Sequence, residues 1–301
     1  MTTGAAQARP ESADEVSRRL LDSAATLSYD PATEIDWSAP LPDGQYGLNP
    51  EWSTLYGTAL WDELSEAQRV ALTRYEVCSI MHTGIWFELI LQQMILRDQY
   101  LKNPADPEFR FALTEIADEC RHSIMFARIC EKLEAPKFEP PRAVAELGRL
   151  LKSTAGGEIA YGGTLVAEEV LDVMQRDWMR GENVLEIVRT SSKIHVVEES
   201  RHMKFARQET KDYMSRVGPV RRHASATLIA GAALVIVQAL VHPAVYKAAG
   251  IDPKRAVAAA AGNEHRKSML RNACAGLMEF LSDAGLLTKP AAAIYRRANM
   301  L

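Results

Sequence analysis

The sequence has 301 residues, of which 47% are hydrophobic and 25% are charged, and its formal net charge is -4. This composition is close to that of an average soluble protein, so it argues against a disordered chain, a collagen-like chain and a nucleic-acid-binding protein that relies on a basic field. The length predicts one large domain or two small ones.

The first 50 residues carry many helix breakers: Pro31, Pro40, Pro42, Gly44, Gly47 and Pro50. Proline removes a backbone donor and clashes with the preceding helical turn, so this density predicts an irregular arm. The first fifteen residues also lack an apolar segment of signal-peptide length. We therefore predict an irregular N-terminal arm over residues 1–50, a single domain over residues 51–301 and no targeting segment.

Long proline-free intervals follow, in which apolar residues recur at helical spacing and no segment shows sustained strand alternation. They predict four long helices, over residues 65–102, 108–134, 142–180 and 183–217. Gly181 marks the break between the last two, because glycine commonly follows a helix end. Two weaker helical segments, over residues 220–248 and 253–286, complete the chain. The predicted fold class is therefore all-α, a four-helix bundle with additional C-terminal helices.

The longest apolar run lies around residues 227–246. It contains Gln238, His242 and Pro243, which leave too few unbroken apolar residues to span a bilayer. We therefore predict a buried helix and no membrane partner. The four cysteines include no C-x-x-C pair, so neither a disulfide framework nor a thiolate zinc site is indicated, and a cytoplasmic location is expected.

Two of the predicted helices contain the same pattern of an acidic residue, Glu, any residue, Arg and His. It reads Asp118-Glu119-Cys120-Arg121-His122 in the second helix and Glu198-Glu199-Ser200-Arg201-His202 in the fourth. A Glu and a His three residues apart project from the same side of a helix, so both can reach one metal ion. Their neighbours are apolar, and a carboxylate in such surroundings needs a positive partner. Carboxylate and imidazole without thiolate favour iron or manganese over zinc.

One further glutamate precedes each motif at the same distance. The interval from Glu88 to Glu119 equals the interval from Glu168 to Glu199, so the Glu and Glu-x-x-His set of the first half repeats in the second half with a constant offset. Each of the four long helices then contributes one carboxylate to a shared site.

Neighbouring glutamates offer alternatives to two of these positions. Glu76 is the alternative to Glu88, and Glu169 is the alternative to Glu168. The matched intervals to the two motifs favour Glu88 and Glu168.

His195 has no counterpart in the first half, where the equivalent residue is Glu115. It lies four residues before Glu199 and seven before His202, so all three lie on one helix face. We infer that His195 is a third histidine ligand. The predicted metal ligands, which would be catalytic through the metal centre, are Glu88, Glu119, His122, Glu168, His195, Glu199 and His202.

The two motifs with their preceding glutamates resemble the ferritin-like di-iron oxygenases, and the additional His195 resembles the p-aminobenzoate N-oxygenase (AurF-type) family. Over residues 50–290 the resemblance implies a ferritin-like bundle with two iron ions, and dioxygen as co-substrate. It also implies a homodimer that oxidises a small-molecule amine, typically an arylamine, to a hydroxylamine, nitroso or nitro product in a biosynthetic pathway. Because the chain contains no G-x-G-x-x-G fingerprint, we expect an external electron donor of ferredoxin or reductase type.

Weaker signals surround these ligands. Asp172 and Glu115 are candidates for contacts with ligand histidines and Tyr161 for a substrate contact, with ion-paired or core positions as the alternatives. Gly156, Gly157, Gly162 and Gly163 precede Glu168 and provide either room for a substrate or close helix packing. Two other functions fit the same scaffold: a di-iron C–H hydroxylase or desaturase, and a non-catalytic iron-storage protein or radical subunit.

Overall fold

The computed structural model describes residues 11–301, and their regular structure is helical. The helices are α1 (Ala13–Thr26), α2 (Pro31–Glu34), α3 (Ala59–Glu63), α4 (Glu66–Gln99), α5 (Pro107–Lys132), α6 (Arg142–Thr154), α7 (Glu158–Trp178), α8 (Glu186–Arg216), α9 (Pro219–Ala239), α10 (Ala244–Ala248), α11 (Pro253–Gly262), α12 (Glu264–Asp283) and α13 (Lys289–Arg297), with the 3-10 helix η1 (Pro50–Trp52).

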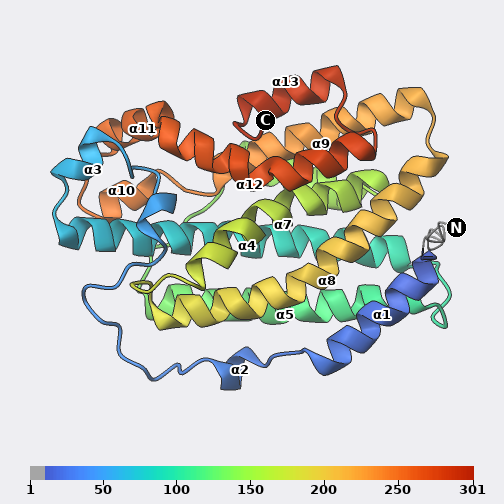
Figure 1. The fold of residues 1–301 in the computed structure, drawn as a ribbon, viewed down its shortest axis with the longest axis horizontal. Helices are drawn as coiled ribbons and strands as arrows, with labels where there is room; N and C mark the ends of the chain where they lie inside the picture. The colour runs from blue at the N-terminus through green and yellow to red at the C-terminus, as the bar shows by residue number, and fades with distance from the viewer. Residues whose placement is uncertain (1–10) are drawn as a thin grey trace, which may run out of the picture.

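Helices α4, α5, α7 and α8 run along the long axis of the molecule and form the central bundle (Figure 1). Helix α4 packs mainly on α5, and α7 packs mainly on α8. Large side chains such as Leu72, Ile129, Leu165 and Phe205 are fully buried between them. Helices α9, α12 and α13 cover one side of this bundle, and α1 covers the opposite side (Figure 1). The predicted all-α, ferritin-like four-helix bundle with additional C-terminal helices is thereby confirmed.

Local capping explains why several boundaries are readable from the sequence. At the start of α4 the Ser65 hydroxyl accepts from the Gln68 N–H at 3.3 Å, and the Gln68 side chain accepts from the Ser65 N–H at 3.1 Å. Helix α5 begins with Pro107, whose missing N–H costs nothing in the first turn. Helices α4, α5 and α8 begin and end within three residues of the predicted bounds, although α8 has no side-chain cap at its start.

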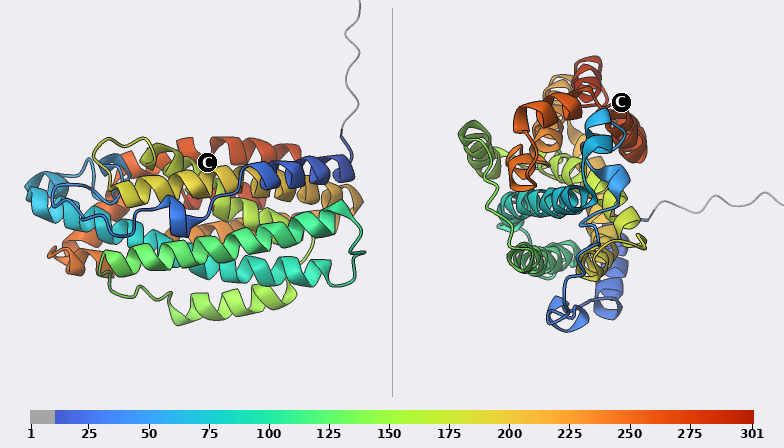
Figure 2. Two further views of the ribbon diagram at one scale, coloured as in Figure 1. Left: turned by 90° about the horizontal axis from the view of Figure 1, so that it is seen from below. Right: turned by 90° about the vertical axis from the view of Figure 1, so that its left-hand side faces the viewer.

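The single helix predicted over residues 142–180 is wrong, because this interval contains the two helices α6 and α7. The chain turns at Gly157, whose φ of 57° lies in the left-handed region that favours glycine. A Cβ at this position would also lie 2.9 Å from the Tyr213 ring. The break separates α6 from the bundle, and α6 lies on the outside next to α4 (Figure 2).

The two C-terminal helical segments are also divided. The segment predicted over residues 220–248 forms two helices, α9 and α10, and α10 begins just after Pro243. The segment predicted over residues 253–286 is split at Asn263, whose side chain accepts from the Arg266 N–H at 3.2 Å and so starts α12.

The prediction of an irregular arm is wrong for residues 13–26, which form α1. Ser12 and Glu15 form a capping box at its start, and residues 11–30 contain no proline. Val16 and Leu20 are buried where α1 packs on α5 and α8. The part of this prediction that concerns residues 1–10 lies outside the described residues.

Helix α9 is buried on one face only. The segment Pro219–Ala248 is long and apolar enough to cross a membrane by length and composition, and 44% of its most apolar window is buried. Ala226, Ala230 and Ala233 face α7 or α13, whereas Leu228 is 53% exposed. The predicted buried helix is therefore a helix with one covered face and one apolar face that remains accessible.

Candidate metal centre

Buried carboxylates and histidines from the four central helices converge inside the bundle. Helix α4 supplies Glu88 and α7 supplies Glu168, while α5 and α8 supply the two repeated motifs. Their candidate ligand atoms form four overlapping groups, and within each group all atoms lie within 4.8 Å of one another. The groups are Glu88, His122 and His195; Glu115, Glu119 and His202; Glu119, His122 and Glu199; and Glu168, His195 and Glu199. All seven predicted ligands are thus brought together, each at most 4% exposed, and Glu115 joins them.

The glutamates of the two motifs occupy the middle of this cluster. Glu199 Oε1 lies 3.1 Å from His202 Nδ1, 3.4 Å from His122 Nδ1 and 3.7 Å from His195 Nε2. Glu119 lies 3.4 Å from His122 Nδ1 and 3.3 Å from His202 Nδ1. Each central carboxylate therefore reaches histidines of both α5 and α8.

The first acidic residue of each motif contacts the histidine of the other motif. His122 Nε2 lies 2.7 Å from Glu198 Oε2, and His202 Nε2 lies 3.2 Å from Asp118 Oδ2. A carboxylate that accepts the Nε2 proton leaves Nδ1 free to bind a metal and fixes the ring orientation. The sequence analysis assigned no role to Asp118 and Glu198, although the acidic residue repeats at this position in both motifs.

The arginines of the motifs complete this reciprocal network. Arg121 donates to Asp118 and lies 3.4 Å from Glu198, and Arg201 lies 3.5 Å from Asp118 and 3.8 Å from Glu198. Arg201 also donates to the carbonyl of Leu27 at 2.9 Å, so the segment that follows α1 covers this side of the cluster. The two arginines neutralise the carboxylates of Asp118 and Glu198. This role of the arginines was not predicted from the sequence.

Burial and mutual interactions perturb the titration of the inner groups in opposite directions. Burial raises the pKa of Glu168 well above its usual range, and the nearby Glu199 and Glu119 raise it further. Burial also opposes ionisation of Glu199, but the charges of His202 and His195 outweigh it and hold its pKa well below the usual range.

Several buried polar atoms in the described part of the chain have no hydrogen-bond partner. They include both carboxylate oxygens of Glu115 and Glu119, Glu199 Oε2, and the Nδ1 atoms of His122 and His195. Orphaned buried groups of this kind are costly unless a ligand satisfies them. When they are all ionised, the four carboxylates predicted as ligands carry four negative charges, which two divalent cations would balance. The oxygen and nitrogen donors fit iron or manganese, and no cysteine belongs to the four groups.

The structure separates the two pairs of alternative glutamates. Glu76 accepts from the Thr54 N–H at 2.8 Å and does not belong to the cluster, whereas Glu88 does. Glu169 accepts two hydrogen bonds from Arg207 at 2.7 and 2.6 Å, whereas Glu168 points into the cluster.

The three weaker candidates, Asp172, Tyr161 and Glu115, lie in different surroundings. Asp172 accepts from Arg176 Nε at 2.6 Å, and its Oδ1 has no partner among the described residues. Tyr161 is buried and donates to Asp98 at 2.9 Å. Glu115 lies in the cluster itself, at the position equivalent to His195.

Glu88, Glu168 and His195 also line a small cavity with a free volume of about 10 Å³, which is about the space of one water molecule. Its other walls are largely apolar: Ile80, Met81, Gly84, Phe87, Phe126, Leu171, Gln175 and Trp178. On the outer side, Ser123 donates to Glu88 Oε2. Glu88, Glu168 and His195 are therefore the predicted ligands that face this cavity.

A protein-family model described as "P-aminobenzoate N-oxygenase AurF" matches residues 10–285. Three curated relatives are the uncharacterized proteins Rv0885 and MT0908 of Mycobacterium tuberculosis and Mb0909 of Mycobacterium bovis. Each is 25% identical to this chain over 219 residues, which cover 69% of this chain and 63% of the relative. The match therefore spans less than two thirds of the length of these relatives.

Proposed function

The chain belongs to the p-aminobenzoate N-oxygenase AurF family, and from this premise we propose that it is a di-iron N-oxygenase that uses dioxygen to oxidise the nitrogen of a small amine. The observation that carries the proposal is the buried cluster of four carboxylates and three histidines with orphaned donor atoms. Two iron ions, when bound there, supply the redox chemistry that activates dioxygen.

The residues of the chain hold and orient that centre. Glu119 and Glu199 reach both motif histidines and would hold the iron ions together with them. Glu88, Glu168 and His195 would complete the ligand sets on the side that faces the cavity. Asp118 and Glu198 keep the histidine protons on Nε2, away from the metal.

The stoichiometry of the proposed reaction requires an electron source. One amine, one dioxygen, two electrons and two protons give one hydroxylamine and one water. We propose that a ferredoxin- or reductase-type donor supplies the two electrons, and that the protein acts as a cytoplasmic homodimer.

The test is a single turnover with isotopically labelled dioxygen. The protein is loaded with Fe(II) without air, mixed with ¹⁸O-labelled dioxygen and a panel of arylamines and alkylamines, and analysed by mass spectrometry. We expect ¹⁸O in a hydroxylamine, nitroso or nitro product. An iron-loaded protein that forms no N–O bond would refute the proposal, and a hydroxylated carbon or a new alkene would favour the hydroxylase or desaturase alternative.

Two adjacent glutamates on α7 provide a matched comparison. Glu168→Gln changes a residue of the cluster, whereas Glu169→Gln changes the adjacent glutamate, which is bound to Arg207. We expect Glu168→Gln to abolish product formation and Glu169→Gln to retain it.

A further inference from the structure

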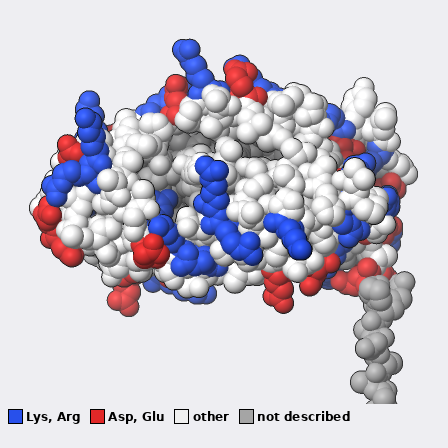
Figure 3. All heavy atoms as spheres, turned by 90° about the horizontal axis from the view of Figure 1, so that it is seen from above, with Lys and Arg blue, Asp and Glu red and all other residues white. Residues whose placement is uncertain are grey.

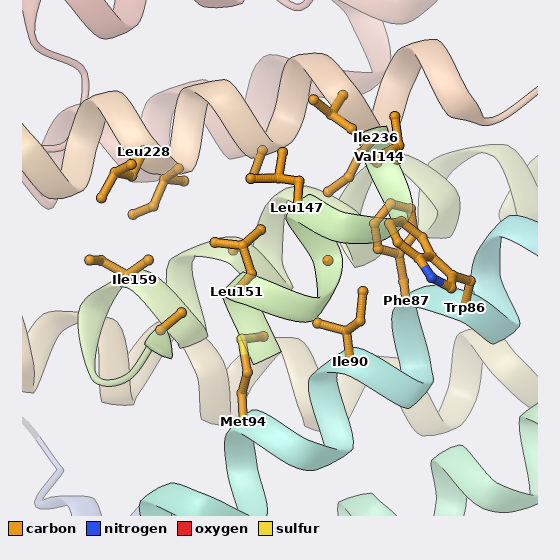
Figure 4. Close-up of a pocket in the computed structure, with 16 residues that line it drawn as sticks. Trp86, Phe87, Ile90, Met94, Val144, Leu147, Leu151, Ile159, Leu228 and Ile236 are labelled. Atoms are coloured by element: carbon orange, nitrogen blue, oxygen red, sulfur yellow. The ribbon is translucent and has the colours of Figure 1, made fainter. Parts of the chain in front are cut away.

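An apolar hollow lies between α4, α6, α7 and α9, next to the bundle that holds the cluster. Its free volume is about 60 Å³, and the hollow is partly open to solvent. The space-filling view shows a hollow with uncharged walls on this face (Figure 3). The close-up shows α6 contributing Leu147 and Leu151 opposite Leu228 and Ile236 of α9 (Figure 4).

The lining of the hollow offers almost no polar group. Of the sixteen lining residues, all in the described part of the chain, Trp86 has the only side chain that can form a hydrogen bond. A carboxylate placed there would lose its water and gain at most the Trp86 indole N–H as a donor and no cation, which is unfavourable. The lining therefore selects hydrocarbon and rejects a charged group such as the carboxylate of an aminobenzoate.

Phe87 connects this hollow with the candidate metal centre. Its side chain lines both the hollow and the smaller cavity that Glu88, Glu168 and His195 also line. The ring also lies against Trp86, with 5.0 Å between the ring centroids. A small molecule bound in the hollow would thus share the Phe87 wall with the cavity that Glu88, Glu168 and His195 line.

Glycines determine where the walls approach and where they stay apart. A Cβ at Gly148 would lie 2.5 Å from the Trp86 ring, and one at Gly162 would lie 2.7 Å from Ile229, so both glycines allow close helix packing. Gly163 also lines the hollow, but a Cβ there would have no atom within 4 Å. The missing side chain at Gly163 leaves space that a larger residue would fill without a clash.

We propose that this hollow binds the hydrocarbon body of the amine substrate, with the nitrogen directed past Phe87 toward the metal centre. The substrate class is then an alkylamine or an alkyl-substituted arylamine without a carboxylate. This inference rests on the proposed N-oxygenase function for the identity of the reacting group, but the apolar site itself does not depend on it. The hollow shares the Phe87 wall with the cavity next to the metal centre, and this favours a substrate over a second copy of the chain as the occupant of the hollow.

The first test measures binding without turnover. The full-length protein as purified, kept under argon, is titrated with the uncharged fluorescent arylamine N-phenyl-1-naphthylamine, and the dye is then displaced by 4-butylaniline or by 4-aminobenzoate. We expect Gly163→Leu to weaken dye binding at least tenfold. Gly276→Leu is the matched control, because Gly276 is an exposed helical glycine of α12 with no atom within 4 Å of its Cβ position. 4-Butylaniline should displace the dye, and 4-aminobenzoate should not.

A second variant keeps the test decisive if Gly163→Leu does not fold. Ala232→Leu fills the hollow from α9, on the opposite wall, and should weaken dye binding to a similar extent. Dye binding that neither variant changes, or equal displacement by 4-aminobenzoate, would overturn the inference. So would a variant that converts a dimer to a monomer in sedimentation, because the hollow would then be covered by a second copy.

The iron-loaded protein distinguishes failure of this inference from failure of the proposed function. We expect kcat/KM for oxidation of 4-butylaniline to exceed that for 4-aminobenzoate at least tenfold, and Gly163→Leu to remove this preference. Dye binding that responds to the variants without oxidation of any amine would support the apolar site and refute the N-oxygenase function. Preferred oxidation of 4-aminobenzoate would support the function and refute the substrate class.

Discussion

Substitution of Glu198 by glutamine tests whether the reciprocal network orients the metal ligands. Glu198 accepts from His122 Nε2 at 2.7 Å and from the Tyr29 N–H at 3.2 Å, and Arg121 lies 3.4 Å away. Glutamine preserves the shape of the side chain but removes its charge. His122 then loses a charge-assisted hydrogen bond, which is roughly twice as strong as a neutral one.

The expected loss follows from the position of Glu198 behind a ligand. Removal of a partner that orients a metal-bound histidine typically reduces metal affinity by about 10–100-fold, which corresponds to about 1.4–2.7 kcal/mol. His122 contacts both Glu119 and Glu199, so a change in its orientation affects the middle of the cluster. We therefore expect Glu198→Gln to bind iron at least tenfold more weakly while Glu198→Ala, which leaves Nε2 without a partner, binds it more weakly still.

The assay is an anaerobic Fe(II) titration by calorimetry, with bound iron counted by elemental analysis and folding checked by circular dichroism. Glu158→Gln is the matched control, because Glu158 is also a buried carboxylate bound to an arginine, Arg221, but lies outside the cluster. A folded Glu198→Gln protein that binds two irons with wild-type affinity would refute the reasoning.

Three further predictions concern the ligands, the metal and pH. His195→Ala should remain folded but lose amine oxidation in the labelled-dioxygen assay, and product at the wild-type rate would contradict a ligand role for His195. Removal of metal by a chelator should lower the melting temperature, because orphaned atoms such as both Glu119 oxygens lose their cation. Added Fe(II) should restore the melting temperature and, at a hundredfold excess over Kd, raise the free energy of unfolding by about 2.7 kcal/mol. A melting temperature that does not depend on Fe(II) would count against the site. Burial opposes ionisation of Glu158, but Arg221 and Ser225 hold the pKa of Glu158 below the usual range. The ionised Glu158 therefore stabilises the fold above the ordinary glutamate pKa of about 4.3, and this contribution is lost as the pH falls. Glu158→Gln should therefore lower the free energy of unfolding by about 1–2 kcal/mol at pH 7 and have little effect near pH 3 in urea titrations, and an equal effect at both pH values would disprove this account.

The chain sequence by itself determined the local features of the site. The spacing Glu-x-x-His places both side chains on one helix face whatever the rest of the fold does, and the equal intervals from Glu88 to Glu119 and from Glu168 to Glu199 assign a carboxylate to each helix. Helix starts with strong local capping, as at Ser65, were also predictable, because their hydrogen bonds join residues three positions apart.

Breaks inside long periodic segments were harder to predict. The left-handed conformation at Gly157 divides the predicted third helix, although the apolar periodicity continues on both sides. At the N-terminus the capping box of Ser12 and Glu15 starts α1. The prolines and glycines from Pro31 onward nevertheless led to the prediction of an irregular arm over all of the first 50 residues.

Only the tertiary structure decided which distant groups meet. Asp118 contacts His202, and Glu198 contacts His122, because α5 and α8 face each other across the bundle at one particular rotation. Glu76 lies on the same helix as Glu88, yet its carboxylate accepts hydrogen bonds from Thr54. Helix periodicity is a property of neighbouring residues, whereas these pairings depend on how separate helices pack. The same packing leaves α6 apart from the bundle and creates the apolar hollow beside Phe87.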